Sequence, residues 1–159
     1  MNFAEDVQII APYLCYNFVR LHEIKLPGGN KLTKIGEYAF YNTTTHDDVS
    51  SYRYLVTIPS SVNEIGQYAF AHSDGITSLS SLTTTLPEWA QYVCYNCGSM
   101  TALAMPPEAQ TTVINQGAFS ECDKLSTVKL SNKIHTIKRD AFSGDSKYTF
   151  KCGDIDSPL

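Results

Sequence analysis

The sequence is short of charge, and neither sign dominates. Charged residues make up 18% of the 159 residues, and the formal net charge is −4. A nucleic-acid-binding surface needs clustered lysine and arginine, which this balance does not supply. No apolar run approaches the roughly 18 residues of a membrane-spanning helix. We therefore expect neither nucleic acid nor membrane insertion among its interactions.

The N-terminus has little of what a secretory signal requires. Residues 1–6 include Glu5 and Asp6, where a signal peptide has a basic start followed by an apolar stretch. The sequence is compatible with a protein that stays inside the cell, with a mature or excised piece, or with export by another route. It therefore predicts no compartment.

What the sequence has in abundance is internal repetition. Four segments read Ile-x-x-x-Ala-Phe, and two weaker copies carry Leu14 and Val93 at the alanine position. Across the six copies this position falls at residues 14, 39, 69, 93, 118 and 141, so the repeat is 23–30 residues long. Repeats of this length are typical of solenoids, in which each coil contacts only its neighbours.

Each copy combines extended segments with a compact one. The block after the Ala-Phe pair, as in Leu125-x-x-Val128-x-Leu130, ends in alternating apolar residues, which predicts a short strand with these side chains inward. Proline follows three such blocks, at residues 27, 59 and 106, and ends the pairing because it has no N–H. A second short extended piece leads into each isoleucine, and the Ala-Phe segment is expected to be a turn or a short 3₁₀ or α-helical segment.

We therefore predict a leucine-rich-repeat solenoid of about six coils, with short parallel strands and mostly β or irregular backbone. A single solenoid is expected over residues 7–152, followed by a polar tail over residues 153–159. The predicted core consists of Ile35, Phe40, Ile65, Phe70, Ile114, Phe119, Leu125, Val128, Leu130, Ile137 and Phe142.

The repeat also resembles a known family. Its pattern, Ile-Gly-x-Tyr-Ala-Phe-x-x-Cys-x-x-Leu-x-x-Ile-x-Leu-Pro, is similar to the BspA-like leucine-rich repeat, also called the Treponema pallidum type, over residues 7 to about 150. The resemblance implies a scaffold without catalytic residues, and a surface or secreted role in adhesion to matrix proteins, host cells or other microbes. The chain departs from the pattern by about six extra residues in the second copy and by a blurred strand in the third copy, around residues 79–86.

Cysteines are the first candidates for metal or redox chemistry. Cys94 and Cys97 form a CxxC, but without a second pair or nearby histidines this is a weak zinc motif. The repeat explains the cysteines better, because Cys15 and Cys94 occupy the phenylalanine position, and Cys97 and Cys122 a cysteine position three residues later. Buried thiols behave as small hydrophobic side chains, so we expect core thiols and neither a metal nor a cofactor.

Other chemical motifs are weak. His46, Asp47 and Asp48 lie together in the insertion of the second copy. Carboxylates there suit a hard cation, but a solvated loop is the preferred interpretation. No Ser-His-Asp or Cys-His set and no glycine-rich phosphate loop can be assembled from the spacing, so no catalytic residue is predicted.

Tyrosine is the one residue type that follows the repeat on its outside. Four tyrosines directly precede the alanine position and three directly follow the phenylalanine position: Tyr13, Tyr38, Tyr68 and Tyr92, and Tyr16, Tyr41 and Tyr95. Because coils stack at about the strand spacing of 4.7–4.9 Å, each set becomes a row. Either the rings lie flat on neighbouring coils and seal the edge of the core, or they form a recognition surface. The rows fade at Gly117 and Asp140.

The insertion adds further candidates, because insertions in solenoids map to one face, often the binding face. The predicted partner-binding residues are Tyr38, Tyr41, Tyr68, Tyr92 and Tyr95 from the rows and Tyr52, Arg53 and Tyr54 from residues 41–54.

Three functional hypotheses follow. The preferred one is a non-catalytic protein-binding or adhesion module for host or cell-surface proteins. The alternative is a structural subunit whose solenoid ends pack on partner chains or on another copy, because no convincing polar cap covers either end. An enzyme or a metal-dependent protein using Cys94 and Cys97 is the least favoured.

Overall fold

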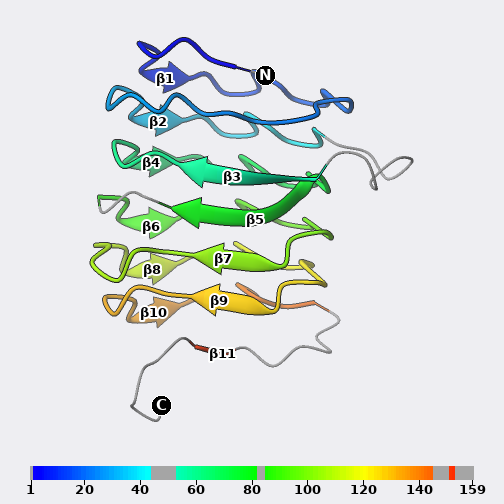
Figure 1. The fold of residues 1–159 in the computed structure, drawn as a ribbon. Helices are drawn as coiled ribbons and strands as arrows, with labels where there is room; N and C mark the ends of the chain where they lie inside the picture. Colours follow the sequence, from blue (N-terminus) through cyan, green and yellow to red (C-terminus); the bar gives the residue numbers. More distant parts are fainter. Residues whose placement is uncertain (1, 44–52, 82–84, 145–150, 153–159) are drawn as a thin grey trace.

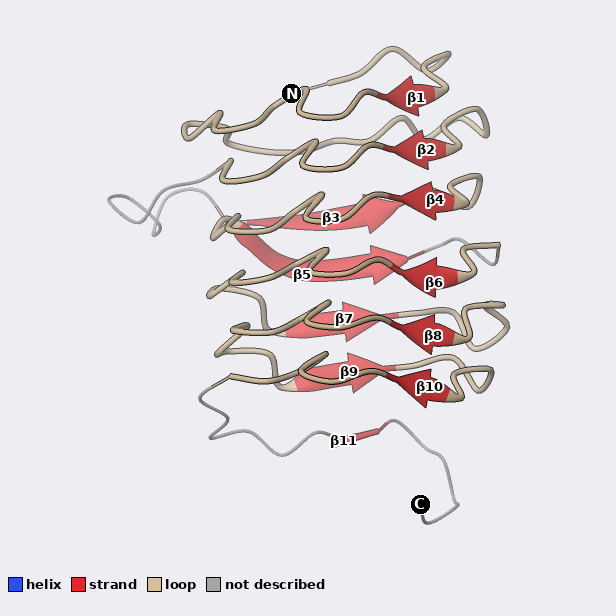
Figure 2. Cartoon of the chain, turned by 180° about the vertical axis from the view of Figure 1, so that it is seen from behind, coloured by secondary structure: helices blue, strands red, loops and turns tan. Residues whose placement is uncertain are grey.

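The computed structural model describes residues 2–43, 53–81, 85–144 and 151–152, and it shows a stack of coils. Two rows of short parallel strands run along the stack, one in front of the other (Figure 1, and from behind in Figure 2). Within the described ranges the regular elements are strands alone. The predicted leucine-rich-repeat solenoid is confirmed.

The first row contains one two-residue strand per copy, ending in the isoleucine position. Its strands are β1 (Ile9–Ile10), β2 (Lys34–Ile35), β4 (Glu64–Ile65), β6 (Glu88–Trp89), β8 (Val113–Ile114) and β10 (Thr136–Ile137). They form two parallel sheets, β1-β2-β4 and β6-β8-β10, in which equivalent positions pair, as Ile10 does with Ile35 and Ile35 with Ile65. The break between β4 and β6 coincides with Trp89, which replaces the isoleucine of the other copies.

The second row is one five-stranded parallel sheet in the order β11-β9-β7-β5-β3. Its strands are β3 (Tyr54–Ile58), β5 (Ile76–Ser81), β7 (Ala102–Ala104), β9 (Thr127–Lys129) and β11 (Lys151–Cys152). Alternation places the equivalent residues Val56, Leu79, Leu103 and Val128 in the core, each in register with the next. The strand expected to be blurred, in the third copy, is instead β5, the longest of the row.

The first copy departs from the prediction of a strand in this row. Among the described residues, Lys25 there forms an isolated parallel bridge with Asn2. The first two copies stay bonded as far as Leu21, whose N–H donates to the carbonyl of Thr43 at 3.1 Å. The next residues of the insertion, 44–52, lie outside the described residues.

Large side chains fill the core where the repeat supplies small ones. Phe40 stacks on Phe70 at 5.5 Å between ring centroids, in parallel planes. Cys15 and Cys94 are smaller than the phenylalanine of the other copies, and a different aromatic ring contacts the neighbouring phenylalanine in each case. Phe3 contacts Phe40 edge-on at 6.1 Å, and Trp89 contacts Phe119 at 5.5 Å. Close packing is thus kept by exchanging volume between positions.

Three parts of the core prediction need qualification or correction. Eight of the predicted residues are buried: Ile35, Phe40, Ile65, Phe70, Ile114, Phe119, Leu125 and Val128. Leu130 and Phe142 are only partly buried. Ile137 is 52% exposed, so its placement in the core was wrong, because β10 is the outer strand of its sheet. At the other end of the stack, Leu14 and Phe18 are exposed, because the first copy has a neighbouring coil on one side only.

Candidate functional site

The tyrosines before the alanine position sit on a turn with an unusual backbone. Tyr13, Tyr38, Tyr68 and Tyr92 have φ between 53° and 58°, and Gly117 and Asp140 have φ of 62° and 57° at the same position. A second left-handed residue follows four positions later, at Asn17, Asn42, His72, Asn96 and Glu121. A left-handed residue does not fit a right-handed helix, which is why the Ala-Phe segments are turns.

These turns are held by hydrogen bonds between coils. The N–H of Tyr38 donates to the carbonyl of Gln67 at 3.0 Å, and that of Phe40 donates to Ala69 at 2.8 Å. Equivalent bonds recur along the stack. Each left-handed non-glycine residue costs about 1–2 kcal/mol, and the coil-to-coil bonds help to offset that cost. The backbone therefore repeats closely enough to align the tyrosine side chains.

The first tyrosine row, Tyr13, Tyr38, Tyr68 and Tyr92, is a continuous aromatic stack. Successive ring centroids are 5.1, 4.9 and 4.9 Å apart, and neighbouring planes are within 12° of parallel. These spacings are close to the strand repeat of 4.7–4.9 Å. The sequence thus predicted which tyrosines form the row, but not that their rings stack face to face.

The second row, Tyr16, Tyr41, His72 and Tyr95, contains a histidine that sequence analysis did not assign to it. Tyr16 stacks on Tyr41 at 5.0 Å. The third copy has Ala71 where a tyrosine would continue the row. His72, one residue later, contacts Tyr41 at 5.0 Å and Tyr95 at 5.2 Å, in both cases edge-on. The sequence signal that could have identified His72 was the pair Ala71-His72, in which the histidine directly follows the position that holds a tyrosine in three other copies.

The two rows lie side by side. Tyr38 and Tyr41 are 5.5 Å apart, and Tyr92 and Tyr95 are 5.8 Å apart, with tilted or edge-on planes. In the first row, both faces of the inner rings, Tyr38 and Tyr68, are covered by neighbouring rings. A partner therefore contacts the ring edges and the hydroxyl groups. Most of these side chains are partly exposed, and Tyr13 is exposed. The surface is rigid because each ring is fixed by its neighbours.

Gly117 ends the first row by steric means. A Cβ atom added there would lie 2.3 Å from the ring of Tyr92. The ring of Tyr92 therefore occupies the space above the fifth copy that a side chain would need. Beyond it, Asp140 occupies the same position and forms an exposed ion pair with Arg139 at 3.1 Å.

Packing within the rows alters tyrosine ionisation. Burial, assisted by the nearby charge of Glu37, raises the pKa of Tyr13. Burial and the neighbouring phenols likewise raise the pKa of Tyr41 and of Tyr68. The protonated hydroxyls of these rings therefore persist to higher pH than that of a free tyrosine.

The insertion contributes less to the predicted surface than expected. Tyr52 lies outside the described residues, and Arg53 is exposed. Tyr54 is only 7% exposed, so its assignment as a contact residue was wrong. Strand alternation in β3 points Tyr54, Val56 and Ile58 inward and leaves Leu55 outward, 51% exposed.

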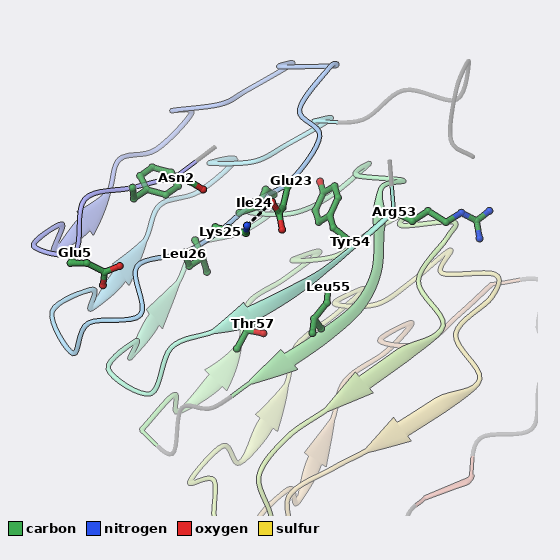
Figure 3. A pocket seen from close by; sticks show the side chains of 11 residues that line it. Asn2, Glu5, Glu23, Ile24, Lys25, Leu26, Arg53, Tyr54, Leu55 and Thr57 are labelled. Carbon is green, nitrogen blue, oxygen red and sulfur yellow. Dashed lines mark ion pairs between the residues drawn. The ribbon is translucent and has the colours of Figure 1, made fainter. Parts of the chain in front are cut away.

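Beside β3 lies a cavity of about 790 Å³ between this strand and the segment Glu23–Leu26 (Figure 3). Its walls mix the apolar Ile24 and Leu55 with charged residues, and Glu23 and Lys25 on its wall are ion-paired at 3.1 Å. These residues belong to the first two copies, which also contain the rings at the N-terminal end of both rows, Tyr13 and Tyr16. The cavity lies beside the second row of strands, whereas the rings lie on the turns.

The cysteines are placed as core side chains. Cys15, Cys94, Cys97 and Cys122 are buried and reduced. The thiol of Cys97 donates to the carbonyl of Phe70 at 3.1 Å, and that of Cys122 to the carbonyl of Cys94 at 3.1 Å. A hydrogen bond from Cys122 lowers the pKa of Cys97, but its bond with Cys94 and burial outweigh this and raise that pKa well above its usual value. Such thiols stay protonated.

Among the described residues, no group of three or more His, Cys, Asp or Glu side chains is arranged to hold a metal ion. Nor does any described helix have the length and hydropathy needed to cross a membrane.

Comparison with known proteins adds an independent line of evidence. Residues 1–53 and 50–155 match the model of the BspA type leucine-rich repeat region, with six copies. No curated protein matches the chain.

Solved structures match over most of this chain. A Treponema pallidum leucine-rich repeat protein superposes with a TM-score of 0.56 at 26% identity, over 81% of this chain and 55% of that one. A leucine-rich repeat protein from Bacteroides ovatus gives a TM-score of 0.55 at 18% identity, over 86% of this chain and 44% of that one. The chain thus spans about half the length of these solved proteins.

Proposed function

Because the chain belongs to the BspA-type leucine-rich repeat family, we propose that it is a non-catalytic protein-binding or adhesion module for host or cell-surface proteins. Leucine-rich repeat proteins commonly mediate protein interactions, which sets the class of function. The observation that carries the proposal is the pair of tyrosine rows across the first four copies. Tyr38, Tyr41, Tyr68, Tyr92 and Tyr95 are its proposed contact residues.

Physical features of the rows support this role. Tyrosine offers apolar area and a hydroxyl group at a low conformational cost, which is why it is enriched in interfaces. Stacking at 4.9–5.1 Å fixes the rings before a partner arrives. Less side-chain entropy is therefore lost on binding.

Binding to an immobilised panel of matrix and cell-surface proteins tests the proposal. We expect Tyr41→Ala combined with Tyr68→Ala to weaken capture of any bound panel member by at least tenfold, because a tyrosine that is a hot spot of an interface contributes roughly 2 kcal/mol. Phe18→Ala is the matched control, since Phe18 is an exposed aromatic outside both rows. Unchanged capture by the folded double variant, checked by circular dichroism, would contradict the proposal.

A structural role in a larger assembly is the second candidate. The first copy exposes five large side chains together: Ile9, Tyr13, Leu14, Tyr16 and Phe18. Exposed apolar patches mark interaction surfaces, and this one suits a partner that packs on the end of the stack. Light scattering at high protein concentration tests self-association, and Leu14→Ser with Phe18→Ser should abolish any oligomer found.

A further inference from the structure

We propose that the tyrosine rows bind an elongated, planar aromatic molecule that lies along the stacking axis of the coils. The inference stands apart from the protein-binding role, because it concerns a small ligand and follows from ring geometry alone. Its basis is the unbroken run of four stacked rings with a second row beside it.

The length of the first row and the spacing of its rings define the site. Three steps of 4.9–5.1 Å place the rings of Tyr13 and Tyr92 about 15 Å apart. A molecule of a few linked aromatic rings has this length. It would span all four rungs, whereas a single-ring compound would contact one or two of them.

Ring orientation defines how the ligand lies. The faces of Tyr38 and Tyr68 are covered by neighbouring rings, so both present their edges outward. Ring edges carry partial positive charge and ring faces partial negative charge, so edge-to-face contact is favourable. A flat aromatic molecule that lies along the row, parallel to the stacking axis, makes this edge-to-face contact with every ring of the row.

Charge defines which flat molecules are tolerated. Glu37 lies near Tyr13 at the outer end of the row, where burial, assisted by the charge of Glu37, raises the pKa of Tyr13, and the whole chain has a net charge of −4. A carboxylate at that end favours a neutral or cationic ligand over an anionic one. A rod-shaped dye whose electron-rich ring faces lie on the tyrosine ring edges, and whose cationic end lies near Glu37, therefore matches the site in length, flatness and charge.

Thioflavin T is the probe for this site. The dye is titrated into the monomeric fraction from size-exclusion chromatography, and both its fluorescence and its induced circular dichroism are recorded. We expect saturable binding with induced dichroism, because the row holds the dye in one chiral orientation. A response confined to aggregated protein, or no saturable response, would overturn the proposal.

Variants locate the dye on the rows. Tyr38→Ala with Tyr68→Ala removes the two inner rungs and should lower the association constant at least tenfold and abolish the induced dichroism. Tyr38→Phe with Tyr68→Phe keeps the ring edges and should bind within about twofold of the parent protein. Ile137→Ala changes an exposed apolar side chain in the last copy, away from the rows, and should leave binding unchanged. Equal binding by the folded alanine variant, or lost binding by the folded phenylalanine variant, would overturn the edge-on site.

A gain-of-function variant covers the case in which the alanine variant does not fold. Gly117→Tyr places a ring at the next rung, where φ is already 62° as at the other tyrosines. The Tyr92 ring, which lies over residue 117, must then shift to make room for the new side chain. The longer row should raise the association constant at least twofold, and unchanged or weaker binding by the folded variant would contradict the proposal. Dye binding without capture of any panel protein would refute the protein-binding role alone.

Discussion

The first four copies and the last two share a backbone but differ in what it displays. The turn before the alanine position has φ between 53° and 62° in all six copies. In the first four copies this position holds stacked tyrosines, and in the last two it holds Gly117 and Asp140. Glycine adopts this conformation without steric cost, whereas tyrosine pays for it. The tyrosines are therefore not required by the turn itself.

This difference separates fold from function within one repeat. Hydrogen bonds between coils persist past the end of the row, as from Phe119 to Ala141 at 2.8 Å. The coil can thus be built without the rings. The tyrosines stand at a backbone position that is unfavourable for them, and the coil does not need them in order to form. We therefore expect them to act as a contact surface. The predictions below test this contrast.

The largest expected effect concerns the stacked core phenylalanines. Phe70 is fully buried and stacks on Phe40, whereas Phe142 is partly buried and stacks on Phe119. We expect Phe70→Ala to lower the free energy of unfolding by about 3–5 kcal/mol, as for fully buried aromatic residues. Phe142→Ala should cost clearly less. Denaturant unfolding measures both, and equal losses would contradict the gradient of burial along the stack.

The next effect concerns the row itself. Tyr68 stacks at 4.9 Å on both Tyr38 and Tyr92. Tyr68→Ala keeps the unfavourable φ but loses two aromatic contacts, each worth about 0.5–1.5 kcal/mol, so a loss of about 1–3 kcal/mol is expected.

Asp140→Ala is the matched control for Tyr68→Ala. It changes the equivalent position in the last copy, where an exposed ion pair and the tolerance of aspartate for positive φ are lost, and should lower stability by only roughly 0.5–1 kcal/mol. Chemical denaturation compares the two variants. A similar, small effect at both positions would mean that the stacked rings add nothing to stability.

Much of this contrast could be predicted from the sequence, because it depends on spacing. The repeat period fixes the solenoid, and the register of the tyrosines fixes which rings share a row. Burial at the ends could not be predicted in the same way: Ile137 has the same pattern as the buried Ile114 but lies on an outer strand. Tyr54 was wrongly assigned as a contact residue, because a shift of one residue along a strand moves a side chain from one face of the sheet to the other.

The left-handed turns could be predicted from the sequence only in part. Asparagine is enriched in that conformation, and Asn17, Asn42 and Asn96 at one recurrent position were an available signal. Tyrosine carries no such preference, so the left-handed position that the tyrosines occupy could not be recognised. Compensation between Trp89 and Cys94 also required three dimensions, since it depends on which side chains meet across coils.

A smaller gain in stability is expected at one of these turns in the fifth copy. Glu121 has φ of 57°, where three other copies have asparagine. Because asparagine tolerates this conformation better, Glu121→Asn should raise the free energy of unfolding by roughly 0.5 kcal/mol, the order found for relief of such backbone cost.

The reciprocal change in the first four copies sharpens the contrast. Asn42→Glu introduces the same backbone cost and also removes the bond from Asn42 Nδ2 to Asn17 Oδ1 at 2.9 Å. It should therefore lose more stability than Glu121→Asn gains. Thermal unfolding of both variants measures the pair, and a loss on Glu121→Asn would show that local contacts of Glu121 outweigh its backbone cost.

The subtlest expected effect is the dependence on pH that the tyrosine rows contribute. Burial raises the pKa of Tyr68 and of Tyr41, so the folded protein holds these protons more tightly than the unfolded chain. Their contribution to stability is complete below the ordinary tyrosine pKa of about 10 and is lost as pH rises through the raised values. Absorbance at 295 nm should therefore show phenolate at higher pH in the folded protein than in urea. Tyr68→Phe should remove part of the late-titrating signal, and coincident folded and unfolded curves would show that the rings are fully hydrated.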